Sequence, residues 1–153
     1  MSDVSFRRAT EADVAAIVAL LADDGLGRGR ENPALPLGRR YLDAFAALDS
    51  DPNQLLVVAE RDGTVVGCLQ LTFIPGLSRL GMWRGQIEAV RVAASERSTG
   101  LGGAMVGWAI ERCRARGCGL VQLTTDKTRA DAHRFYERLG FVASHEGMKL
   151  ALS

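Results

Sequence analysis

The segment Arg97-Ser98-Thr99-Gly100-Leu101-Gly102-Gly103 stands between two apolar patterns of different period and decides the fold. Residues 87–92 before it alternate in the manner of a half-buried strand. Residues 104–116 after it carry apolar side chains at helical spacing. A strand that turns through glycines into a helix leaves the N–H groups of the first helical turn free to bind an anion. The sequence therefore predicts a diphosphate site at residues 97–103.

Two common diphosphate motifs do not fit this segment. A Walker loop requires a lysine after its last glycine, and no lysine follows Gly102 or Gly103. A dinucleotide fingerprint requires a third glycine where this chain has Met105, and it normally lies in the first strand-helix unit of its domain. The remaining pattern is R-x-x-G-x-G.

A second motif lies downstream, in Ala132-His133-Arg134-Phe135-Tyr136-Glu137-Arg138-Leu139-Gly140-Phe141. Together the two segments resemble the pyrophosphate loop and the A-x-x-F-Y-E-x-x-G-F segment of the GNAT superfamily of acetyl-CoA-dependent N-acetyltransferases. The resemblance covers nearly the whole chain. It implies acetyl-CoA as cofactor and direct transfer of the acetyl group to an amine.

Composition sets the broad class. The chain has 153 residues, of which 47% are hydrophobic and 24% are charged, and its net charge is +1. These values predict one globular domain over residues 1–153, with no bulk attraction to nucleic acid or membrane. No signal peptide is visible in Met1-Ser2-Asp3-Val4. Three cysteines without a C-x-x-C pair favour no metal site and a reduced, cytoplasmic setting.

The element pattern predicts an α/β fold of GNAT type, a mixed and mostly antiparallel sheet flanked by helices. Strands are expected at 4–8, 54–60, 64–74, 86–92, 120–125, 141–144 and 148–152. Helices are expected from Thr10 to about residue 21 and at 39–49, 104–116 and 129–139. Asp62-Gly63 predicts a tight hairpin between the second and third strands.

Two residues are candidate catalytic groups. In the resembled family, the tyrosine at the place of Tyr136 lies near the coenzyme sulfur, so Tyr136 is the candidate acid for the leaving thiolate. The alternative is a purely structural role, because Tyr136 also belongs to an apolar helical stripe. Glu88 is the candidate base or amine contact, with a charge facing the sheet edge or an ion pair to Arg84 or Arg91 as the alternative. Regular alternation would put residues 88, 90 and 92 on one face of their strand.

The expected cofactor contacts are backbone N–H groups of residues 97–103 and the Arg97 side chain, together with Val90, Val92, Phe135 and Asp126. A backbone N–H near Val90 is the candidate oxyanion donor. Ser98 and Thr99 depart from the family pattern, and we expect Ser98 to have an ordinary backbone geometry. Asp126 stands where the family frequently has an asparagine, and helix capping is the alternative role for it.

The acceptor is predicted from the loops at 25–38 and 75–84, which carry or adjoin Arg28, Arg30, Arg39, Arg79 and Arg84. Arginines suit a carboxylate or phosphate, although ordinary surface charge explains them as well. Gly85-Gln86-Ile87-Glu88 and Gly147-Met148-Lys149-Leu150 resemble parts of glucosamine-6-phosphate N-acetyltransferases. The resemblance therefore implies a small-molecule amine acceptor that can carry an anionic group, and a homodimer, which is common in the family. The open alternatives are a protein lysine or N-terminal acetyltransferase and a non-catalytic acetyl-CoA sensor.

Overall fold

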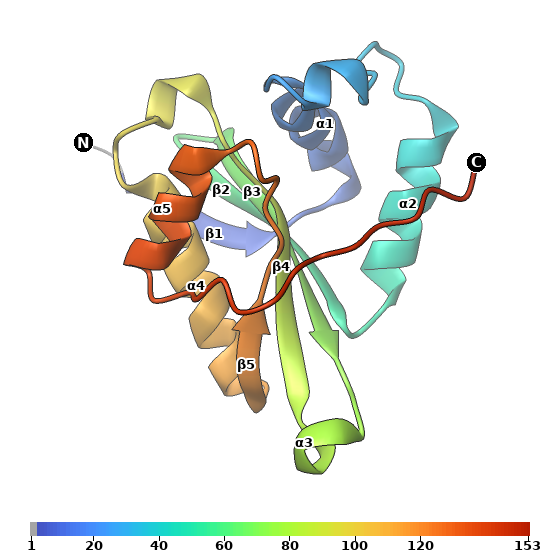
Figure 1. Cartoon of the computed structure of the whole chain (residues 1–153). Coiled ribbons are helices and arrows are strands. Elements are labelled where there is room, and N and C mark those ends of the chain that lie inside the picture. The colour runs from blue at the N-terminus through green and yellow to red at the C-terminus, as the bar shows by residue number, and fades with distance from the viewer. Residues whose placement is uncertain (1–2) are drawn as a thin grey trace.

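The computed structural model describes residues 3–153 and is built on one five-stranded sheet (Figure 1). Met1 and Ser2 of the predicted domain lie outside the described residues. The strands lie side by side in chain order: β1 (Ser5–Arg8), β2 (Gln54–Arg61), β3 (Thr64–Ile74), β4 (Trp83–Val92) and β5 (Cys118–Gln122). All neighbours are antiparallel except β4 and β5, which are parallel. The prediction of a mixed, mostly antiparallel sheet is confirmed.

Helices cover both sides of the sheet. They are α1 (Val14–Ala22), α2 (Arg39–Ser50), α3 (Ser78–Gly81), α4 (Leu101–Ala115) and α5 (Ala130–Arg138), with 3-10 turns η1 (Glu11–Asp13), η2 (Gly27–Gly29) and η3 (Ala94–Glu96). Figure 1 shows α4 and α5 on one side, with α1 and α2 on the other. The buried stripe of α4 consists of Leu101, Met105, Val106, Ala109 and Cys113, which pack on the sheet. The helix begins at Leu101, before the predicted start at residue 104.

The hairpin between β2 and β3 forms as predicted. Asp62 and Gly63 both have a positive φ, of 51° and 77°, which is the backbone of a type I′ turn. This turn fixes the pairing of Arg61 with Thr64. The central strand β3 is consequently held against β2 on one side and β4 on the other.

A β-bulge interrupts β4 at Ala89, whose φ is 55°. Gln70 of β3 pairs with Glu88, whereas Cys68 pairs with Arg91, so β4 holds one extra residue. Glu88 and Arg91 therefore share the sheet side of α1. Val90 and Val92 pack instead with the core under α4. The expectation that residues 88, 90 and 92 share a face is wrong, because alternation holds only along a regular strand.

The two strands predicted at 141–144 and 148–152 are absent. Residues 141–153, the C-terminal segment, form neither helix nor strand. In Figure 1 this segment leaves α5 and crosses in front of the sheet towards α2. The alternation of apolar residues is present, but a strand also needs hydrogen bonds to the backbone of a neighbour, and no described strand pairs with this segment.

Candidate functional site

The glycine loop, residues 97–103, consists of the turn that follows η3 and the first three residues of α4, and it exposes backbone N–H groups at the helix N-terminus. Gly100 has φ 86° and is the residue that caps α4. Within the described residues, no acceptor binds the N–H groups of Ser98, Gly100, Leu101, Gly102 and Gly103. The helix dipole adds a partial positive charge at this end. The loop therefore offers a convergent set of donors suited to a diphosphate.

Some of the expected loop contacts serve the loop itself. The N–H groups of Arg97 and Thr99 donate to the carbonyls of Ala94 and Glu96, each over 3.3 Å. The Thr99 hydroxyl also donates to Glu96 O over 2.6 Å. The Arg97 side chain turns back to Asp23, 3.6 Å away. Arg97 and Thr99, which were expected to contact the cofactor, therefore stabilise the loop by these contacts.

Ser98 does not have the ordinary backbone expected for it. Its φ is 67°, in the left-handed region, because the chain reverses direction between η3 and α4. A non-glycine residue in this region costs about 1 kcal/mol. The loop therefore keeps a glycine-like geometry despite the departure in sequence, and that geometry leaves the Ser98 N–H unpaired.

Three elements meet beside the glycine loop. A Cβ placed on Gly102 of α4 would lie 3.5 Å from Cζ of Phe135 on α5 and 3.8 Å from Cγ2 of Val92 on β4. The pairing of β4 with β5 ends at Gln86 and Gln122. From Ile87 to Val92, β4 consequently has no partner strand on its β5 side within the described residues. This unpaired edge includes Val90 and leads to the glycine loop.

Tyr136 projects from α5 into an aromatic cluster near this edge. Its ring makes edge contacts with Phe135 and Phe141, at centroid distances of 5.0 and 5.7 Å. Burial raises the pKa of the Tyr136 phenol, while the charges of Arg91 and Arg129 oppose this effect. The phenol therefore stays protonated at neutral pH, because the two arginines offset only part of the effect of burial on its pKa.

The two arginines are held by Asp24, which sequence reasoning did not include. Nε of Arg91 lies 2.8 Å from Oδ2 of Asp24, and Nη2 of Arg129 lies 3.3 Å from the same oxygen. Burial would raise the pKa of Asp24, but the Gly27 N–H and the two arginines hold it below its usual value. No sequence signal indicates this cluster, because the bulge at Ala89 turns Arg91 towards it.

Glu88 lies in a row of polar side chains on the sheet side that α1 and α2 occupy. This polar row runs across the strands and consists of Gln54, Gln70, Thr72, Arg84, Gln86, Glu88 and Gln122. Arg84 donates to Gln122 over 3.2 Å, and Gln122 donates to Gln86 over 3.0 Å. Glu88 is exposed, and its carboxylate makes no hydrogen bond or ion pair with any described residue. The alternative of an ion pair with Arg84 or Arg91 is therefore not observed, and the carboxylate is free to meet an amine.

Asp126 closes a local turn and does not cap α5, whose N-cap is Arg129 with no side-chain hydrogen bond, so the capping alternative is not observed. Its Oδ1 accepts from the N–H and hydroxyl of Thr128, over 2.9 and 2.6 Å. These hydrogen bonds lower the pKa of Asp126. The carboxylate therefore closes the turn before α5, and a contact between Asp126 and the cofactor stays a prediction.

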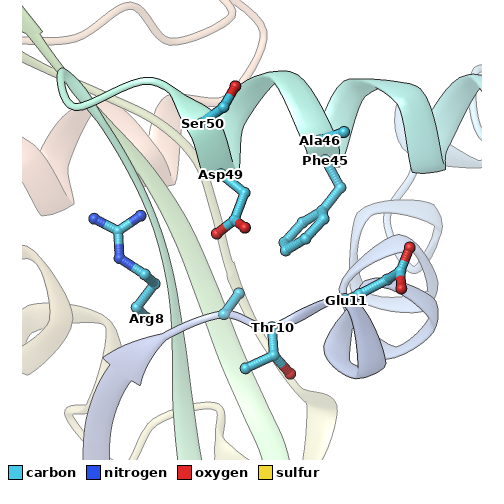
Figure 2. A pocket seen from close by; sticks show the side chains of 8 residues that line it. Arg8, Thr10, Glu11, Phe45, Ala46, Asp49 and Ser50 are labelled. Atoms are coloured by element: carbon cyan, nitrogen blue, oxygen red, sulfur yellow. The ribbon is translucent and has the colours of Figure 1, made fainter.

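A separate hollow of about 530 Å³ lies between β1 and α2. Figure 2 shows Phe45 and Asp49 pointing into it from α2, towards the segment that holds Thr10. Its lining consists of Arg8, Ala9, Thr10, Glu11, Phe45, Ala46, Asp49 and Ser50. None of these residues belongs to β4, α4 or α5, so the hollow is not part of the candidate site.

Metal and thiol chemistry receive no support from the side chains. Within residues 3–153, no cluster of three or more His, Cys, Asp or Glu residues could hold a metal ion. Burial raises the pKa of both Cys68 and Cys113 to about 12, so neither is a thiolate at neutral pH. No helix in this described range is both long and apolar enough to cross a bilayer.

A glycine loop at a helix N-terminus, beside an opened strand pair and an aromatic cluster, defines an α/β acyltransferase domain. Residues 20–141 match the model of the Acetyltransferase (GNAT) family. The chain therefore belongs to this family, and it is an acetyl-CoA-dependent N-acetyltransferase.

Several relatives agree with this assignment. The aminoalkylphosphonate N-acetyltransferase of Salmonella typhimurium is 38% identical over 69% of this chain and 68% of its own length. The glucosamine 6-phosphate N-acetyltransferase of Trypanosoma brucei brucei is 38% identical, and the match spans 59% of each chain.

Solved structures confirm the fold. A Bacillus halodurans C-125 protein described as a transcriptional regulator superposes with a TM-score of 0.96 and 51% identity, over 98% of this chain and 100% of its own. A Trypanosoma brucei acetyltransferase superposes with a TM-score of 0.79 and 31% identity, over 98% and 100% of the two chains.

Proposed function

We propose that this enzyme acetylates the primary amine of a small metabolite that also carries a phosphate or phosphonate group. The polar row is the observation that supports this proposal most directly. It presents the unpaired Glu88 carboxylate, which suits an ammonium group, on the same sheet face as Arg84, which suits an anion. The two named relatives act, by their names, on amines that carry such a group.

Acetyl-CoA supplies an activated thioester. The chain has groups that fit its diphosphate, namely the unpaired N–H groups of the glycine loop. The unpaired edge of β4 suits an extended ligand that adds to the sheet by backbone hydrogen bonds. A backbone N–H near Val90 would donate to the carbonyl oxygen on which negative charge develops. Val92 and Phe135 would line the cofactor site, since a Cβ placed on Gly102 of the glycine loop would contact both side chains.

Glu88 and Tyr136 take the two proton-transfer roles in this proposal. Glu88 accepts a proton from the amine, directly or through a water molecule, because its carboxylate is exposed and unpaired. Tyr136 donates its phenolic proton to the departing sulfur. Burial raises the pKa of the phenol, and the positive charges of Arg91 and Arg129 reduce this cost of losing the proton. The buried thiols of Cys68 and Cys113 support direct transfer without an acetyl-cysteine.

The test is a comparison of matched amines by mass-spectrometric detection of acetylated product. An aminoalkylphosphonate and glucosamine 6-phosphate are each compared with the counterpart that lacks the anion, and a basic peptide represents the protein-acetylating alternative. We expect the anionic amines to have a kcat/KM roughly 10- to 100-fold higher, the value of one charge-assisted hydrogen bond. Arg84→Gln should abolish this preference while keeping acetylation of the neutral amines. Equal rates with and without the anion, or preference for the peptide, would overturn the assignment.

A further inference from the structure

A second hollow, of about 220 Å³, lies where β1, β2 and β3 meet the C-terminal end of α4. It is separate from the candidate site, because no residue of the glycine loop, β4 or α5 lines it. It shares only Arg8 with the larger hollow beside α2. Three of its lining residues are arginines and none is acidic. The lining consists of Arg8, Pro52, Gln54, Leu55, Phe73, Arg112, Ala115 and Arg116.

The fold brings the three arginines to this hollow from two elements. Phe6 and Arg8 stand at alternate positions of β1 and share a face, and the Phe6 ring lies with its centroid 5.9 Å from that of Trp108 on α4. Arg112 and Arg116 follow Trp108 at intervals of four residues, so they lie in one column on the same side of the helix. Like charges at this spacing repel each other and destabilise a helix. An anion beside the column would remove this repulsion.

Two of the guanidinium groups are held in place without being neutralised. Arg112 lies over the ring of Trp108, 4.7 Å from its centroid, and Arg116 lies over the ring of Phe73, 4.0 Å from its centroid. Arg116 also donates to the carbonyl of Pro52 over 3.2 Å and to the amide oxygen of the next side chain over 2.8 Å. These neutral partners restrict the side chains but leave their charge intact. Such preorganisation lowers the entropic cost of binding an anion.

The positive charge of the hollow has no acidic partner within residues 3–153. No ion pair joins any of the three arginines to a carboxylate. Glu111, the acid in this part of α4, pairs with Arg114 instead. Asp49 points into the larger hollow and forms no ion pair with Arg8 (Figure 2). The helix dipole favours cations at the end of α4, but it does not account for Arg8, which belongs to β1.

We propose that this hollow is a second anion site, which binds a compact ligand with a phosphate or diphosphate group. Guanidinium groups that approach from two elements suit the tetrahedral oxygens of a phosphate better than the two oxygens of a carboxylate. Leu55 and Phe73 add an apolar surface for the organic part of a phosphate ester. The hollow is smaller than the roughly 300 Å³ or more of sites for larger organic ligands, which favours a compact one. The inference is independent of the acceptor and of catalysis.

Calorimetric titration with inorganic pyrophosphate tests the proposal. The full chain is first saturated with acetyl-CoA, so that the glycine loop is occupied and cannot bind the probe. We expect saturable binding with a Kd of about 1 mM or lower at physiological salt. Acetate at the same ionic strength should show no saturable binding, because a carboxylate offers only two oxygens. The titration is repeated with Arg84→Gln, in which pyrophosphate should still bind, because Arg84 belongs to the proposed acceptor site and does not line this hollow.

Arg8→Gln and Arg112→Gln are the test variants, because neither side chain forms a hydrogen bond or an ion pair with a described residue and folding should be unaffected. Each should raise the pyrophosphate Kd roughly tenfold, through the loss of one charge-assisted hydrogen bond. Arg114→Gln is the matched control, because it removes the same charge from the same end of α4 but does not line the hollow. Its Kd should stay within about twofold of the wild-type value.

Four results would overturn the proposal. The first is the absence of saturable pyrophosphate binding to the wild type, and the second is binding that disappears in Arg84→Gln. The third is a Kd that is unchanged in both test variants or raised equally in Arg114→Gln, which would show attraction to the overall charge of the surface. The fourth is acetate binding as tight as that of pyrophosphate.

Discussion

Asp13 ties the first strand to the first helix and allows a quantitative prediction for its replacement by asparagine. Arg7 donates to both carboxylate oxygens of Asp13, over 2.7 and 2.9 Å, and the Thr10 N–H donates to Oδ2 over 2.7 Å. Arg7 also donates to Glu60 over 2.8 Å. Asp13 is 7% exposed, so solvent screens these contacts weakly. Asp13→Asn keeps the side-chain shape and removes the charge.

The pKa of Asp13 gives the size of the effect. The Arg7 hydrogen bonds lower it from 3.8 to about 2, with burial opposing and the Thr10 N–H assisting. One pKa unit corresponds to about 1.4 kcal/mol, so the charged form contributes roughly 2.5 kcal/mol to the free energy of unfolding. Because the folded-state pKa is the lower one, this contribution is present above pH 3.8 and is lost as the pH falls to about 2.

Urea unfolding of wild type and Asp13→Asn as a function of pH is the assay. We expect the variant to be less stable by about 2 kcal/mol at neutral pH, with the difference shrinking as the pH falls towards 2. Asp43→Asn is the control, because the Arg39–Asp43 pair is exposed and contributes at most about 0.5 kcal/mol. A difference between wild type and Asp13→Asn that is independent of pH would refute this reasoning.

Three further predictions concern the candidate site. Tyr136→Phe should lower kcat about 100-fold. Acetyl-CoA affinity and melting temperature should stay within error, because no described residue forms a hydrogen bond with the hydroxyl. Full turnover by this variant would remove Tyr136 as the acid. Glu88→Gln should likewise lower kcat about 100-fold, which stopped-flow or mass detection of product measures. Unfolding in urea should be unchanged, since the Glu88 carboxylate makes no hydrogen bond or ion pair with a described residue. Gly102→Glu should weaken acetyl-CoA binding at least roughly tenfold in calorimetry, because the added carboxylate lies near Phe135 and repels the diphosphate. Gly107→Glu is the control, because it adds the same charge farther along α4, and it should bind acetyl-CoA normally.

The sequence by itself determined the local chemistry of the chain. The glycine loop, the Asp62-Gly63 hairpin and the buried stripe of α4 follow from residue types and spacings that act over a few positions. The two motifs, in order and at the right separation, also indicated the family, and the match over residues 20–141 confirms it. These features are local, because glycine conformations, helix periodicity and capping depend on near neighbours.

Contacts between distant elements required the tertiary structure. The bulge at Ala89 arises from the pairing of β4 with β3, and it alone turns Arg91 towards Asp24 and separates Glu88 from Val90. The positive φ of Ser98 is set by the reversal between η3 and α4 rather than by the residue itself. The C-terminal segment has the alternation of a strand yet forms none, because alternation specifies only which faces are apolar. Whether a strand forms depends on a free edge within reach, and the sequence of a single chain does not specify where such an edge lies.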